Sequence, residues 1–149
     1  MRPILTFEEE LTALTTYLDH GSFKYESLSI PFNRLVRKHF SGVRRSEKYG
    51  VYIVRKRSTS NVLVIGKSGA ITQEGKFKLQ DIPKRLCNVK QGDKPANEWF
   101  SEVFQENGPL IIEYIFLDQT PISPHFVESL LLQAYLNEKG FLPRYNKSF

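Results

Sequence analysis

The side chain that points most directly to chemistry in this 149-residue sequence is a glutamate within an apolar helical stretch. The residues three and four positions after Glu128, its neighbours on a helix, are Leu131 and Leu132. A lone carboxylate on an apolar stripe is costly unless it is paired or holds a cation. Mg²⁺ is commonly held by one or two carboxylates together with substrate phosphate and water. Glu128 is therefore a ligand of a divalent cation, the partner of an arginine, or a residue at the edge of the apolar stripe.

Two more candidates belong to a predicted hairpin. Two runs rich in β-branched and aromatic residues, 51–54 and 62–65, flank a basic and polar turn, which is typical of a β-hairpin. Tyr52 lies in the first run, and a phenol can orient or deprotonate a water molecule. Lys67 follows the second run, within reach of a phosphate. Both also have ordinary interpretations, as strand packing for Tyr52 and as a solvated turn residue for Lys67.

The remaining candidates are an arginine and an asparagine. Arg85 belongs to a short helix predicted to begin at residues 81–83, and an arginine aimed at a phosphate would offset charge that develops in a transition state. A structural ion pair explains this arginine equally well. Asn146 lies near the end of the sequence in a turn-like segment. The three histidines match no zinc spacing, and the single Cys87 excludes a disulfide framework or a cysteine-rich zinc site.

The basic residues are concentrated in one segment. The net charge is +5, but residues 34–57 alone carry nine basic residues against Glu47, a local excess of +8. Such a block suggests a polyanionic partner, although a solvated charged surface would have the same composition. The basic residues are Arg34, Arg37, Lys38, Arg44, Arg45, Lys48, Arg55, Lys56 and Arg57.

The predicted elements that must position these side chains are both helices and strands, which are interspersed along the sequence. Amphipathic helices are predicted over 7–18 and 31–40, the hairpin over 51–65, helices from 81 and over 95–106, a strand over 110–117 and a long helix up to 139. This order predicts an α+β domain. No apolar run approaches the roughly 18 residues of a membrane span, and the first residues do not form a secretion signal, so we expect a cytoplasmic protein.

In this order, the candidate residues resemble the motifs of the GIY-YIG nuclease family. The segment 50–52, Gly-Val-Tyr, is similar to the first motif and 64–66, Val-Ile-Gly, to the second. Arg85, Glu128 and Asn146 resemble the family's arginine, metal-binding glutamate and late asparagine. The resemblance implies a central three-stranded antiparallel sheet flanked by helices within residues 46–149, preceded by a helical N-terminal extension over residues 1–45.

What the resemblance implies chemically is hydrolysis of a DNA strand with one divalent cation, Mg²⁺ or Mn²⁺. Glu128 would hold the metal, Tyr52 would help to activate water, and Arg85 and Lys67 would stabilise the charge at the phosphate. Two positions depart from the family pattern, because Val64 replaces the second-motif tyrosine and Val89 replaces a histidine often found after the arginine. Some restriction endonucleases of this family also have variant motifs.

Three functions follow from these observations. The first is a metal-dependent DNA endonuclease, of the site-specific restriction type if the extension is a recognition arm for duplex DNA. The second is a catalytically degenerate nucleic-acid-binding module, suggested by Val64 and the basic block. The third is a protein-interaction domain. The extension itself is either a DNA-contacting element or a dimerisation element that would make the protein a homodimer.

Overall fold

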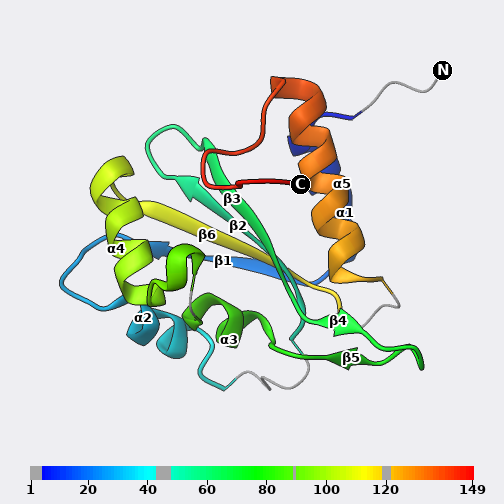
Figure 1. Ribbon diagram of the computed structural model, residues 1–149, viewed down its shortest axis with the longest axis horizontal. Coiled ribbons are helices and arrows are strands. Elements are labelled where there is room, and N and C mark those ends of the chain that lie inside the picture. Colours follow the sequence, from blue (N-terminus) through cyan, green and yellow to red (C-terminus); the bar gives the residue numbers. More distant parts are fainter. Residues whose placement is uncertain (1–4, 43–47, 89, 119–121) are drawn as a thin grey trace.

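The computed structural model describes residues 5–42, 48–88, 90–118 and 122–149, and it is an α+β fold (Figure 1). Its centre is a four-stranded antiparallel sheet in the order β1-β6-β2-β3. The strands are β1 (His20–Tyr25), β2 (Gly50–Lys56), β3 (Val62–Ser68) and β6 (Leu110–Phe116). The prediction of an α+β domain is confirmed, and so is the predicted hairpin, formed by β2 and β3.

The predicted three-stranded sheet is wrong because the N-terminal region contributes a fourth strand. The sequence of β1, His-Gly-Ser-Phe-Lys-Tyr, has little β-propensity, and only Phe23 and Tyr25 are buried. This strand forms because its backbone pairs with β6 along its whole length, from His20 opposite Ile115 to Tyr25 opposite Leu110. The N-terminal region therefore contains a strand as well as the predicted helices.

Helices cover both faces of the sheet (Figure 1). One face packs against α2 (Phe32–His39), α3 (Ile82–Cys87) and α4 (Ala96–Asn107), and its core includes Tyr52, Phe100 and Ile112. The other face packs against α1 (Phe7–Tyr17) and α5 (Pro124–Lys139) through residues such as Ile53 and Leu131. Alternate residues of β2 thus pack on opposite faces of the sheet. Tyr52 belongs to the face that α2, α3 and α4 cover, whereas α5 lies on the other face.

Three of the helices, α1, α3 and α5, begin at residues whose side chains cap them. Thr6 and Glu9 form a reciprocal capping box at α1, and the Asp81 side chain accepts a hydrogen bond of 3.0 Å from the Lys84 amide at α3. Helix α5 is capped by Ser123 and ends at Gly140, which has a left-handed backbone conformation.

The long connection between β3 and α3 contains a small second hairpin. Strands β4 (Ala70–Ile71) and β5 (Phe77–Lys78) pair with each other, and the Phe77 ring stacks on Tyr49 at a centroid distance of 5.2 Å. A short 3₁₀ helix, η2 (Gln91–Asp93), lies between α3 and α4. Among the described residues, no helix has the length and apolar character needed to cross a bilayer.

Candidate active site

The five residues predicted to be catalytic line one pocket of about 270 Å³. They come from four different elements and from the C-terminal segment: Tyr52 from β2, Lys67 from β3, Arg85 from α3, Glu128 from α5, and Asn146. The pocket lies along β3, the strand at the edge of the sheet, whose residues Val64 to Lys67 form one wall. Residues up to 94 positions apart in the sequence are thus brought to one place.

The register of the β2–β3 hairpin sets the position of the Tyr52 phenol. Tyr52 pairs with Gly66 on the neighbouring strand, and its ring occupies the space above this glycine. A Cβ atom at residue 66 would lie only 2.2 Å from Tyr52 Cζ and 2.4 Å from its hydroxyl oxygen. Tyr52 therefore requires a glycine at position 66, because a side chain there would displace the ring.

The Tyr52 phenol is buried beside opposite charges. Burial raises its pKa, Arg85 counteracts this increase, and the Glu128 carboxylate adds to it. The phenol is therefore protonated at neutral pH and can donate a hydrogen bond into the pocket. An additional positive charge at the site would favour its deprotonation.

Glu128 is half-buried, and cationic groups surround it. Burial raises the pKa of this carboxyl group, whereas Lys67, His125 and Arg85 lower it. His125 lies one helical turn before Glu128 and is exposed. In the sequence, the signal that links this histidine to Glu128 is their i, i+3 spacing on one predicted helix.

Asn146 contacts the backbone of the edge strand. Its Oδ1 accepts a hydrogen bond of 2.9 Å from the Ile65 amide, and its Nδ2 donates one of 2.9 Å to the Ile65 carbonyl. The neighbouring Tyr145 amide donates a further hydrogen bond of 2.9 Å to the Leu63 carbonyl. Asn146 therefore pairs with β3 as a strand residue would, and it holds the C-terminal segment against the pocket wall.

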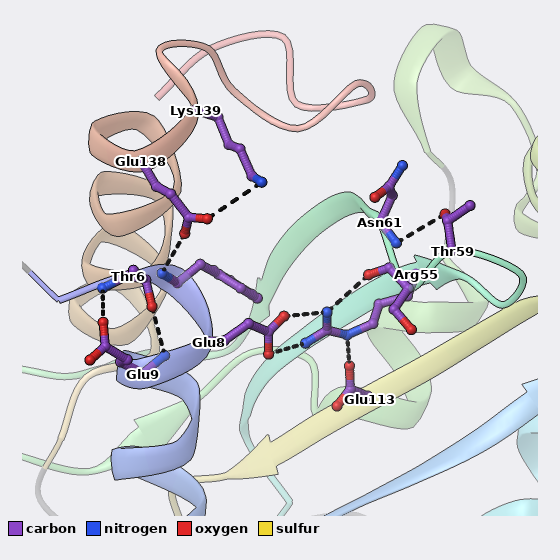
Figure 2. Close-up of polar contacts among 11 residues, drawn as sticks. Thr6, Glu8, Glu9, Arg55, Thr59, Asn61, Glu113, Glu138 and Lys139 are labelled. Atoms are coloured by element: carbon purple, nitrogen blue, oxygen red, sulfur yellow. Dashed lines mark hydrogen bonds and ion pairs between the residues drawn. The ribbon is translucent and has the colours of Figure 1, made fainter.

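Some residues of the basic block form intramolecular ion pairs, and others lie on an exposed helix face. Arg55 is buried, and Figure 2 shows its guanidinium between Glu8 of α1 and Glu113 of β6. Arg57 pairs with Glu26, and Lys48 Nζ lies 3.6 Å from a carboxylate oxygen of Asp118. All three cations thus form ion pairs within the protein, and none of them lines the pocket of the candidate site.

The other members of the block lie elsewhere. Arg34, Arg37 and Lys38 are exposed on α2, which packs against α3, the helix that carries Arg85. Lys56 lines a separate pocket of about 460 Å³ near the other end of β3. The predicted contacts Arg44 and Arg45 lie outside the described residues.

The donor set of the pocket suits a hard cation bound together with substrate. Within the described part of the chain, Glu128 is the one carboxylate that lines it, and no cluster of three or more histidine, cysteine, aspartate or glutamate residues is suited to a metal ion. A site of this kind fits Mg²⁺ or Mn²⁺ bound by one carboxylate, with phosphate oxygens and water completing the coordination. It does not fit a structural zinc ion, which needs four protein ligands.

Comparison with known proteins gives no further assignment: no family model, no curated protein and no solved structure matches the chain.

Proposed function

We propose that this protein is a metal-dependent DNA endonuclease that hydrolyses phosphodiester bonds. The observation that carries the proposal is that the five predicted catalytic residues line one pocket at the edge of the sheet. Their chemistry is complementary: a carboxylate for a cation, two positive side chains for a phosphate, and a phenol for a water molecule. Side chains chosen only for packing would have no reason to converge with these functions.

The proposed roles follow from the geometry. Glu128 would hold Mg²⁺ or Mn²⁺, which when bound would polarise the scissile phosphate. Lys67 and Arg85 lie near this carboxylate and would stabilise the negative charge that develops on the phosphate. Burial keeps the Tyr52 phenol protonated, so it would orient the attacking water. The positive charge of a bound metal ion would lower the pKa of the phenol and so favour its action as a base. Asn146 would hold the wall of the pocket in place.

We propose that the substrate is duplex DNA, because a cationic helix lies beside the element that carries Arg85. Arg34, Arg37 and Lys38 on α2 are exposed and can contact phosphates on either side of the cleavage point. We further propose that cleavage is site-specific, as in restriction endonucleases. It predicts discrete fragments rather than scattered breaks.

A second candidate is a nucleic-acid-binding module that has lost catalysis. The observation that favours it is Val64, which lines the pocket where the resemblance calls for a tyrosine. In this case DNA binding would weaken steeply with salt, and a metal ion would leave the DNA intact.

The test is cleavage of supercoiled plasmid and long linear duplex, with Mg²⁺ or with a chelator. We compare the wild type with Glu128→Gln and with Glu138→Gln, a matched substitution ten residues later on the same helix. Discrete metal-dependent fragments that disappear only in Glu128→Gln would support a site-specific nuclease. Nicking or a smear with the same mutant pattern would support the nuclease and reject sequence specificity. Intact DNA with salt-sensitive binding would support the binding module.

A further inference from the structure

Lys90, a residue that the proposed function does not use, lies behind the candidate site. Its Nζ donates a hydrogen bond of 2.5 Å to the carbonyl of Arg85, near the end of α3. The same ammonium lies 5.7 Å from the centre of the Tyr52 ring and 5.8 Å from that of Phe100. Among the residues that the structure describes, no carboxylate forms an ion pair with it.

Lys90 thus connects α3, which carries Arg85, with Tyr52 of β2, and both of these residues line the pocket. Helix α3 has only six residues, so few backbone hydrogen bonds hold it. Lys90 binds a carbonyl near its C-terminal end and contacts the face of the Tyr52 ring, an arrangement in which a cation is attracted to the aromatic electrons. Lys90 does not line the pocket itself, so it is placed to position other groups rather than to attack a substrate.

We propose that Lys90 is a positioning residue of the nuclease site, holding Arg85 and the Tyr52 ring in the geometry that catalysis requires. The inference rests on the proposed function. It explains why a long polar side chain lies half-buried beside two aromatic rings, at a place where an apolar residue would pack with a smaller desolvation cost.

The protonation of Lys90 should be visible in the pH dependence of kcat. Burial is the main reason that the pKa of this amine falls to about 7; the positive Arg85 lowers it further, and Cys87 of α3 raises it. The ionisable group that faces it from β2 is the Tyr52 phenol, and α4 contributes the uncharged Phe100. The protonated form makes the stronger contact with the ring, so its contribution is complete well below pH 7 and is lost as the pH rises through this value.

The test compares steady-state cleavage by the wild type, Lys90→Met, Lys90→Arg and the control Lys94→Met. Lys94 is four residues away, and it is paired at the surface with Glu102. We expect Lys90→Met to lower kcat about 10- to 100-fold while KM changes by less than about threefold, because small displacements of catalytic groups reduce kcat strongly. Lys94→Met should behave as the wild type.

Two further measurements separate positioning from a structural role. Lys90→Met removes a half-buried amine whose charged form is disfavoured by the fold, so its melting temperature should be equal to or above that of the wild type at pH 6, even though kcat falls. Lys90→Arg keeps a cation that does not titrate, so a fall in kcat near pH 7 in the wild type should be absent in this variant.

The inference is overturned if Lys90→Met cleaves as the wild type does, if only KM changes, or if activity and melting temperature fall together. A fall in kcat near pH 7 that persists in Lys90→Arg would also overturn it. If the wild type itself leaves DNA intact with Mg²⁺, the proposed function fails, and the role of Lys90 fails with it.

Discussion

At the residue scale, the half-buried carboxylate of Glu128 has a desolvation cost that a bound cation would offset. Its carboxyl group has a raised pKa because burial disfavours the charged form more than Lys67, His125 and Arg85 favour it. A group whose pKa is higher in the folded than in the unfolded protein destabilises the fold at pH values above that pKa. This cost disappears in acid, where the carboxyl group is protonated in both states.

We therefore predict that Glu128→Gln stabilises the metal-free protein at pH 7, by about 0.5–2 kcal/mol. The gain should shrink as the pH falls toward the ordinary glutamate value of 4.5. Mg²⁺ should raise the melting temperature of the wild type but not that of the variant, because the variant lacks the carboxylate proposed to hold the ion. Thermal unfolding at several pH values, with Mg²⁺ or chelator, measures both effects.

The opposite result would change the role of this residue. If Glu128→Gln lowers the melting temperature at pH 7, the carboxylate stabilises the fold through its cationic neighbours. Glu128 would then be a structural ion-pair partner, the alternative that the sequence left open.

At the element scale, the outer edge of β3 is covered by the C-terminal segment. Open strand edges are prone to pair with other chains, and proteins often cover them. The Asn146 side chain and the Tyr145 amide provide three hydrogen bonds to β3, at Leu63 and Ile65. The same contacts hold the strand that forms one wall of the candidate site.

We predict that Asn146→Ala destabilises the protein by about 1–3 kcal/mol, since each lost hydrogen bond contributes about 0.5–1.5 kcal/mol. Amide hydrogen exchange at Ile65 should become faster. Lys147→Ala, at the exposed next residue, is the control. Unchanged exchange at Ile65 would show that Asn146 does not protect the edge.

At the scale of the whole molecule, charged residues connect the N-terminal region with the sheet. Arg55 makes a bidentate pair with Glu8 of α1, with N···O distances of 2.5 and 3.1 Å, and it also contacts Glu113 of β6 (Figure 2). Helix α1 also packs on α5, where the Phe7 and Tyr135 rings meet edge to face at 6.0 Å. The N-terminal region is thus attached to the fold by both charge and packing.

The basic block should therefore divide into structural and DNA-contacting residues. We predict that Arg55→Met lowers stability by about 1–3 kcal/mol, because it leaves two carboxylates without their partner. It should leave the salt dependence of DNA binding unchanged. Replacing Arg34, Arg37 and Lys38 together by alanine should reduce the slope of log affinity against log salt by about 2–3 and leave stability nearly unchanged.

DNA affinity over a range of salt concentrations, together with denaturant unfolding, tests this division. Arg57→Met is the matched control, because its pair with Glu26 is exposed and should contribute less than about 1 kcal/mol. If Arg55→Met changes the salt slope as much as the triple variant does, Arg55 belongs to the DNA-binding surface.

Local patterns were sufficient to predict much of this molecule. The β2–β3 hairpin, the capped helices α1 and α5 and the α+β class follow from residue alternation, helical spacing and capping side chains, which act over a few residues. The five candidate residues could also be named from their types and order. What they do with DNA and metal stays a prediction.

Contacts between distant segments decided the rest. Strand β1 has weak propensity and exists because β6 offers an unpaired edge, so no local pattern revealed it. The assignment of Arg55 to an internal ion pair required Glu8 and Glu113, which are 47 and 58 residues away. Lys90 was missed for the same reason, since its position between Arg85 and Tyr52 depends on how α3 packs on the sheet. Such contacts arise from packing, and packing is a property of the whole fold.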